Sequence, residues 1–152
     1  IRDFCLSRGL EMCIRDSPWA GRHAMARGTQ AGWITADLFD LPAERRFDVV
    51  TCGLFAHHLP DPELVRFLRW LPAHATRRWL ILDLHRHWIP WCAVWAGTRL
   101  MRMHPMVIHD GPVSINRGFT REDWTRLLAE AGIEAEIRWV APFRWAVSGR
   151  GA

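Results

Sequence analysis

Two adjacent histidines follow a short apolar run and are the residues best suited to chemistry. Residues 48–53 (DVVTCG) form a β-branched run that ends in Cys52 and Gly53, and His57 and His58 come shortly after it. Such a run predicts a buried strand, and open α/β sheets bind their ligands at the carboxyl ends of strands. Histidine titrates near neutral pH, so either ring is a candidate to remove a proton from a substrate. We expect at most one of the two to point into a cleft.

Two further polar positions follow predicted elements. Asp37 closes a short strand predicted at 33–36, where it either contributes to a site or starts a turn. His109 lies in HDGP (109–112), which predicts a turn. His109 is either a third candidate base or, with Asp110 and Arg117, part of the wall of an acceptor pocket.

The elements that would position these residues alternate between strand and helix. Asp61-Pro62-Glu63 predicts a helix start, Thr120 with Asp123 forms a capping box, and Gly132 predicts the end of that helix. A turn at Pro142 predicts a terminal hairpin. The remaining expected elements are strands at 48–53 and 79–82, a partly helical segment at 84–106, and an antiparallel pair at 135–141 and 143–149. This alternation favours an α/β fold with a mostly parallel sheet and helices on both faces.

Composition excludes several classes of protein. The net charge is +4, but the 20 basic residues form no single block, so no nucleic-acid partner is expected. Four cysteines without a CxxC pair predict neither a metal site nor a disulfide framework, and they fit a reducing cytoplasm. No apolar run reaches the roughly 20 residues of a membrane span. Peripheral membrane contact through Trp88, Trp91 and Trp95 is the alternative that we keep.

The ordered set of motifs resembles a class I S-adenosylmethionine-dependent methyltransferase of small molecules. The set comprises ADLFDLP, FDVVTCGLFAHHLPD, a helix, WLILDLHR, and a hairpin after FTREDWTRLLAEAGI, and it covers roughly residues 30–150. The resemblance implies a Rossmann-like sheet that closes with an antiparallel hairpin, S-adenosylmethionine as cofactor, and a small-molecule acceptor such as a phenolic or polyketide-type hydroxyl. HDGPVSINRGFT is similar to a subgroup found near polyketide synthases.

The resemblance also implies roles for individual residues. Asp37 would accept a hydrogen bond from the adenine amine, Leu38 would offer its backbone amide, and Phe39 would cover a ring face. The base that deprotonates the acceptor would be His57, His58 or His109. The positions that match the cofactor cleft are Asp37, Leu38, Phe39, Thr51, Cys52, Gly53 and Leu54.

The N-terminal part departs from the family pattern. No glycine-rich turn precedes Trp33, and residues 1–32 show no convincing strand that ends in an acid. Residues 1–17 repeat IRD and carry no sustained period, so we interpret them as a non-native or disordered segment and residues 18–152 as a partial methyltransferase domain. The expected sheet therefore lacks its first two strands, and methyl transfer by this chain would be impaired.

Two other functions compete with methyl transfer to a small molecule. The first is a non-catalytic remnant of the fold that contacts a partner or a membrane surface through the Trp-rich segment at 88–106. The second is nucleic-acid methylation, which would need an Asn/Asp-Pro-Pro-aromatic run after the strand at 48–53. The chain has GLFA there, which disfavours it.

Overall fold

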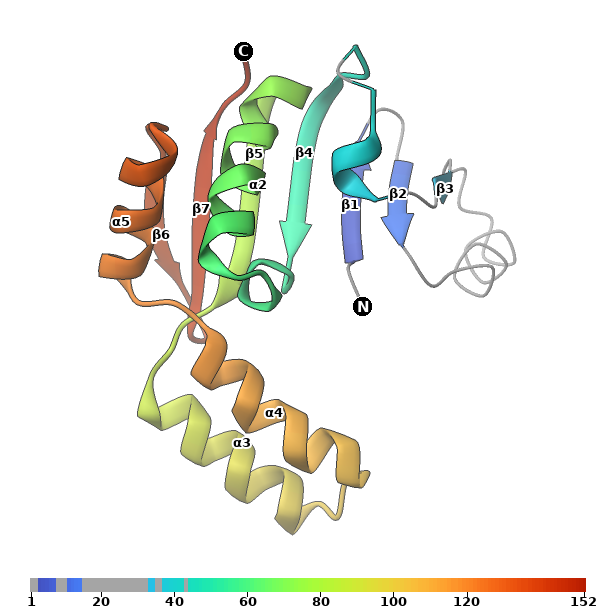
Figure 1. Ribbon diagram of the computed structural model, residues 1–152. Helices are drawn as coiled ribbons and strands as arrows, with labels where there is room; N and C mark the ends of the chain where they lie inside the picture. Colours follow the sequence, from blue (N-terminus) through green and yellow to red (C-terminus); the bar gives the residue numbers. More distant parts are fainter. Residues whose placement is uncertain (1–2, 8–10, 15–32, 35–36, 43) are drawn as a thin grey trace.

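A computed structural model describes residues 3–7, 11–14, 33–34, 37–42 and 44–152. Seven strands form one sheet in the order β3-β2-β1-β4-β5-β7-β6 (Figure 1). The strands are β1 (Asp3–Ser7), β2 (Glu11–Ile14), β3 (Trp33–Ile34), β4 (Phe47–Gly53), β5 (Ala75–Leu84), β6 (Glu136–Val140) and β7 (Arg144–Arg150). The helices are η1 (Leu38–Asp40), η2 (Ala56–His58), α2 (Asp61–His74), α3 (Trp88–Leu100), α4 (Pro105–Arg117) and α5 (Arg121–Ala131).

The core lies between the sheet and two helices, α2 and α5. Leu64, Phe67 and Leu68 of α2 are fully buried, and they recur at the helical spacing that gives α2 one apolar face. Trp124 and Leu127 of α5 are buried against the same cluster. Burial of each such side chain contributes about 1.5–3 kcal/mol. This single core holds β4 and β5, and therefore the loops at their carboxyl ends, in fixed positions.

Three helix boundaries predicted for this region are confirmed. Helix α2 begins at Asp61 with a proline in its first turn. In α5 the Thr120 side chain accepts from the backbone N–H of Asp123, and the Asp123 carboxylate accepts from the N–H of Thr120. Gly132 ends the helix in the left-handed conformation, with φ 71°, as the sequence predicted.

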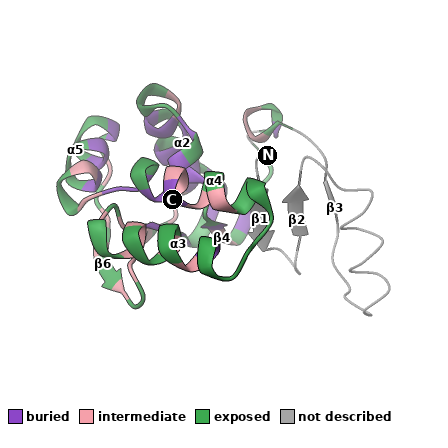
Figure 2. Cartoon of the chain, turned by 90° about the horizontal axis from the view of Figure 1, so that it is seen from below, coloured by how far each residue is buried: buried purple, intermediate pink, exposed green. Residues whose placement is uncertain are grey.

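The prediction of helices on both sheet faces is wrong for the described residues. Helices α2 and α5 contact each other and cover the same face (Figures 1 and 2). Alternate residues of a strand point to opposite faces, so Trp79 and Ile81 are buried while Leu80 and Leu82 are each 37% exposed. The opposite face of the central strands is therefore open to solvent.

The sheet is mixed rather than mostly parallel, and its middle is occupied. Strands β4 and β5 pair in parallel, but β1 runs antiparallel to both β2 and β4. Only three residues separate β1 from β2, too few for the crossover that parallel neighbours need. Strands β1 and β2 thus lie between β3 and β4, with β2 parallel to β3 and β1 antiparallel to both of its neighbours. The origin of residues 1–17 stays a prediction, because strand pairing does not report it.

Helices α3 and α4 form an antiparallel pair that projects past the carboxyl end of β5 (Figure 1). The turn predicted at residues 109–112 is wrong, because these residues lie inside α4 with Pro112 in mid-helix. Neighbouring turn-forming residues suggested a break, but the pairing of α4 with α3 keeps the segment helical. No helix among the described residues combines the length and apolarity that a membrane crossing requires.

The C-terminal hairpin confirms its prediction and explains one glycine. Strands β6 and β7 pair antiparallel, and β7 also pairs antiparallel with β5. Gly149 lies opposite Trp79, and a Cβ atom at Gly149 would lie 2.5 Å from the Trp79 indole. A residue without a side chain is needed here for the buried ring to lie flat on the sheet. Strand β5 is longer than the predicted strand at 79–82. Arg77 and Arg78 lie within it with exposed side chains, so the apolar run marked only part of the strand.

Candidate functional site

A buried histidine–aspartate pair lies where β4 and β5 end. Parallel pairing of Gly53 with Leu82 brings η2 beside the last residues of β5. There the Asp83 carboxylate, 0% exposed, lies 2.7 Å from Nδ1 of His57. It also accepts from the backbone N–H of His57 at 3.3 Å and of Leu84 at 2.7 Å. The carboxylate is therefore held from three directions.

This contact fixes the hydrogen positions of the His57 ring. An ionised carboxylate can only accept, so Nδ1 of His57 carries a hydrogen, and in the neutral ring Nε2 is then the lone-pair acceptor. Buried acids orient catalytic histidines in the same way in enzymes that use histidine as a general base. The His57–Asp83 pair has the geometry of such a base.

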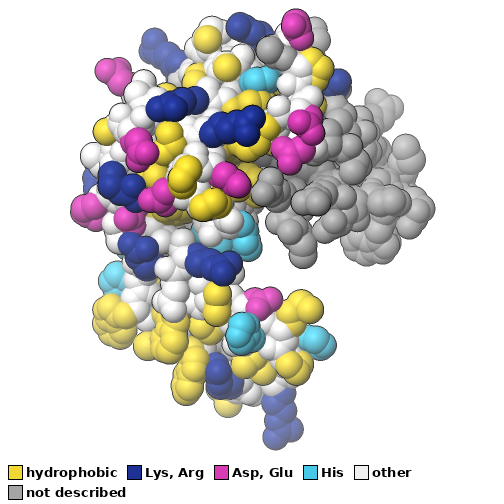
Figure 3. Space-filling view, in the orientation of Figure 1, with side chains coloured by type: hydrophobic (Ala, Val, Ile, Leu, Met, Phe, Trp, Pro, Cys, Tyr) yellow, Lys and Arg dark blue, Asp and Glu magenta, His cyan; other side chains and the backbone are white. Residues whose placement is uncertain are grey.

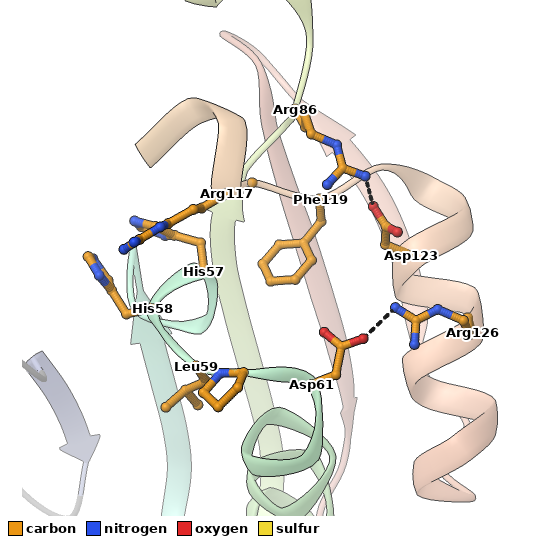
Figure 4. A pocket seen from close by; sticks show the side chains of 11 residues that line it. His57, His58, Leu59, Asp61, Arg86, Arg117, Phe119, Asp123 and Arg126 are labelled. Atoms are coloured by element: carbon orange, nitrogen blue, oxygen red, sulfur yellow. Dashed lines mark hydrogen bonds and ion pairs between the residues drawn. The ribbon is translucent and has the colours of Figure 1, made fainter. Parts of the chain in front are cut away.

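His57 lines a pocket of about 540 Å³ between η2, the start of α2, the end of α4 and the start of α5 (Figure 4). Phe119 forms an apolar wall, and most of the other lining residues are charged. Arg86 pairs with Asp123 at 2.6 Å and Arg126 pairs with Asp61 at 2.8 Å. The remaining lining residues are His58, Leu59, Pro60, Arg117 and Gly118.

Arg117 gives this pocket an excess of positive charge. The pocket contains three arginines and two aspartates, and both aspartates pair with the other two arginines. Figure 4 shows the Arg117 side chain reaching from the end of α4 over His57. An anion that forms beside His57 would be attracted to this guanidinium.

The His58 ring lies beside the His57 ring, with centroids 4.1 Å apart and planes tilted by 38°. Partial desolvation lowers the pKa of His58, and the neighbouring His57 lowers it further. His58 therefore favours its neutral form. Of the pair predicted from sequence, His57 is the buried, oriented ring and His58 is the exposed one.

The structure does not bring His109 to this pocket. Its side chain is 79% exposed on α4 and contacts Asp110 at 2.9 Å. His109 was placed near the acceptor because its segment was read as a loop, whereas α4 carries it away on an exposed helix face. The described residues include no group of three or more His, Cys, Asp or Glu side chains arranged to hold a metal ion.

The residues predicted for the adenine end form a separate pocket of about 360 Å³. The Asp37 carboxylate accepts from the backbone N–H of Phe39 at 3.0 Å and caps η1. Of the two roles predicted for Asp37, this contact corresponds to the start of a turn. The guanidinium of Arg66 lies 3.9 Å from the Phe39 ring centroid. Leu38 is half-buried and packs against the core. One face of Phe39 is thus covered by Arg66 from α2.

The other predicted cofactor residues divide between the two faces of the sheet. Cys52 is 2% exposed and belongs to the core beneath α2, so its side chain does not line a cleft. Thr51 and Gly53 alternate with it and lie on the open face. A Cβ atom at Gly53 would meet nothing within 4 Å. Leu54 is 48% exposed with φ 54°.

Sequence reasoning named Arg117 as an acceptor-side residue but missed Asp83, Arg86 and Arg126. Asp83 follows a buried strand, as Asp37 does, and that shared position is the signal that could have identified it. Arg86 and Arg126 gave no signal, because only the packing of α5 beside α2 brings them to one cavity.

The fold is that of part of the small-molecule methyltransferases of known structure. No family model matches the sequence, and no curated protein matches it. The matched solved structures described below each share less than 25% identity with the chain, so the likeness is one of fold.

Three matched structures are representative. N,N-8-amino-8-demethyl-D-riboflavin dimethyltransferase (RosA) from Streptomyces davawensis is 18% identical with a TM-score of 0.61, over 93% of this chain and 41% of its own. An O-methyltransferase family 2 protein from Planctomyces limnophilus, in complex with apigenin, is 11% identical with a TM-score of 0.56, over 88% and 39%. Magnesium protoporphyrin IX methyltransferase (ChlM) from Synechocystis, with bound SAH, is 16% identical with a TM-score of 0.50, over 89% and 57%.

The chain spans about two fifths of the length of the first two of these proteins. The residues that the resemblance assigns to S-adenosylmethionine do not converge on one cleft among the described residues. The space at Gly53 would admit a close ligand, but Cys52 points into the core and Asp37 caps its own helix. The described residues therefore do not form a complete cradle for this cofactor.

Proposed function

We propose that this chain carries the acceptor side of an S-adenosylmethionine-dependent methyltransferase that acts on a small hydroxylated molecule. The observation that supports this most strongly is the buried His57–Asp83 pair, which opens on a pocket at the carboxyl ends of two parallel strands. In open α/β sheets this edge is where ligands bind. The fold shared with methyltransferases supports the reaction class.

In this proposal the chain's own residues prepare the acceptor. Nε2 of His57 accepts the proton of the acceptor hydroxyl, while Asp83 keeps the ring in the required tautomer and stabilises the imidazolium that forms. The guanidinium of Arg117 stabilises the resulting oxyanion. S-adenosylmethionine would supply the methyl group, and we expect the chain to bind it weakly because the described residues assigned to it do not converge on one cleft.

Two measurements test the proposal on the chain as it stands. Calorimetric titration with S-adenosylhomocysteine should give a dissociation constant weaker than micromolar, since most of the cradle is absent from the described residues. With radiolabelled methyl donor in excess, slow transfer to a panel of hydroxylated planar aromatics is expected. The substitution His57→Gln should lower that rate by about 10²–10⁴-fold.

Particular outcomes would contradict the proposal. Absence of transfer above the uncatalysed rate for every acceptor would exclude methyl transfer by this chain. An equal loss of rate in His57→Gln and His109→Gln would remove the assignment of the base to η2. Micromolar binding of S-adenosylhomocysteine would contradict the expected weak binding of the cofactor.

A second candidate function rests on the surface of α3 and α4. Leu100 is 86% and Met101 69% exposed, and they lie between Arg99 and Arg102. Trp88 is also 70% exposed, and Figure 3 shows the hydrophobic side chains gathered over this part of the molecule. Exposed apolar side chains flanked by arginines match the chemistry of an anionic lipid surface.

We propose as the alternative that these two helices bind an anionic membrane surface. Flotation with phosphatidylglycerol-containing vesicles should recover the protein, and a variant with alanine at Leu100 and Met101 should remain unbound. Equal recovery with purely zwitterionic vesicles, or undiminished recovery of the variant, would contradict it. His57→Gln should leave flotation unchanged, so the two functions are tested separately.

A further inference from the structure

A second cavity lies where the α3–α4 pair meets the ends of β5 and β7. Its volume is about 530 Å³, within the roughly 300–1,000 Å³ of small-molecule sites. We call it the hairpin cavity. It shares no lining residue with the His57 pocket. Ile89 and Val94 of α3, with Ile115 of α4, form an aliphatic wall.

The opposite wall of the hairpin cavity is flat and aromatic. Phe143 and His85 stack with ring centroids 6.1 Å apart and planes 27° apart. Behind them, Nε1 of Trp139 donates to Nδ1 of His85 at 3.2 Å. With Nδ1 accepting, Nε2 of His85 carries the ring hydrogen and is a donor. Burial, followed by the charge of His87, lowers the pKa of His85, which agrees with a neutral ring.

A single cation lies among the lining residues. Nη1 of Arg144 donates to the carbonyl oxygens of Phe143 at 3.3 Å and Pro142 at 3.5 Å, which anchors the guanidinium to the β6–β7 turn. None of the ion pairs among the described residues includes Arg144. Its remaining N–H groups form a fork that suits a carboxylate. Ser114 adds one hydroxyl from α4.

From this arrangement we propose that the hairpin cavity binds a planar aromatic acid. The ring system lies between the aliphatic wall of α3 and α4 and the Phe143–His85 wall, since offset stacking favours a flat ligand. The carboxylate pairs with Arg144. The site goes beyond the proposed methyl transfer, because it requires neither the methyl donor nor His57.

Binding of three probes tests the site. Naphthalene-2-carboxylate, neutral 2-methylnaphthalene and aliphatic decanoate are titrated against the whole chain, with tryptophan fluorescence and calorimetry as readouts. We expect naphthalene-2-carboxylate to bind about tenfold more tightly than neutral 2-methylnaphthalene, which lacks the charge-assisted hydrogen bond to Arg144. It should also bind more tightly than decanoate, which carries a carboxylate but no flat ring to stack on the aromatic wall. Arg144→Gln should abolish the preference over 2-methylnaphthalene. Arg138→Gln, an exposed arginine on the same β hairpin but outside the cavity, should keep it.

A filled cavity gives the second criterion. Ser114→Leu from α4 and Ala93→Leu from α3 both place extra volume in the cavity, and whichever variant retains the wild-type circular dichroism melting curve is titrated. Loss of naphthalene-2-carboxylate binding in that variant supports the site. Wild-type affinity in a folded filled variant, equal affinity for decanoate, or no saturable binding by the wild type would overturn the proposal. None of these results depends on methyl transfer, so the two proposals fail independently.

Discussion

Replacing Asp83 with asparagine tests the best-defined interaction of the site. The two side chains have nearly the same shape, but the carboxylate presents two acceptor oxygens and the amide only one. In the structure one carboxylate oxygen faces both Nδ1 of His57 and the N–H of Leu84, and the other faces the backbone N–H of His57. The amide nitrogen must therefore face a donor in either orientation.

The loss in free energy of unfolding caused by Asp83→Asn can be estimated from these contacts. If the amide nitrogen replaces the oxygen that accepts from the backbone N–H of His57, that N–H loses its acceptor. If the amide nitrogen replaces the other oxygen, the backbone N–H of Leu84 loses its acceptor, and His57 must switch to the tautomer with hydrogen on Nε2. Each case leaves one buried backbone N–H unpaired, which costs about 1–3 kcal/mol. That corresponds to a fall of roughly 2–4 °C in Tm for each kcal/mol at this chain length. Asp83→Ala removes every acceptor and should cost about 3–5 kcal/mol.

Urea unfolding followed by circular dichroism measures the loss of stability, and ¹⁵N spectra of the histidine rings report the tautomer. We expect wild-type His57 to carry its hydrogen on Nδ1, with Asp83→Asn less stable than wild type. A wild-type spectrum with hydrogen on Nε2 would refute the proposed orientation of the base. Unchanged stability of Asp83→Asn would show that the carboxylate is not the acceptor for three donors.

Three further predictions concern the frame that holds the site. Gly149→Val should destabilise the fold by about 1–3 kcal/mol, because its Cβ atom would lie 2.5 Å from Trp79. Gly97→Ala in α3, where a Cβ atom would meet nothing within 4 Å, should stabilise the fold by about 0.5–1 kcal/mol. The melting temperatures of the two variants should therefore shift in opposite directions. Thr120→Ala removes half of the α5 capping box and should cost about 0.5–2 kcal/mol in urea unfolding, while Thr120→Ser should restore most of it. Burial lowers the pKa of His85, so the unfolded chain binds the proton more readily and the free energy of unfolding falls as the pH drops below about 6.5. His85→Gln should therefore weaken the pH dependence of the urea unfolding midpoint. A variant with the same pH dependence as the wild type would contradict this prediction.

Local signals were sufficient for elements whose ends carry their own hydrogen bonds. The capping box at Thr120 and the glycine stop at Gly132 follow from hydrogen bonds within a few residues. The start of α2 at Asp61 has no side-chain cap and follows instead from the proline in its first turn. The same reasoning failed for residues 109–112, where turn-forming residues lie in a helix that is stabilised by α3. Local propensity is a weak determinant once a partner helix is available.

The sequence by itself determined that a histidine pair follows a buried strand at the edge where α/β sheets bind ligands. Only the tertiary structure decided which histidine is oriented, because Asp83 lies 26 positions along the chain from His57 and meets it through the parallel pairing of β4 with β5. The sheet also decided that Cys52 faces the core and Thr51 the open face, since the side-chain direction of a strand residue depends on which face α2 and α5 cover. Strand periodicity gives the alternation, whereas long-range packing decides which side is inside.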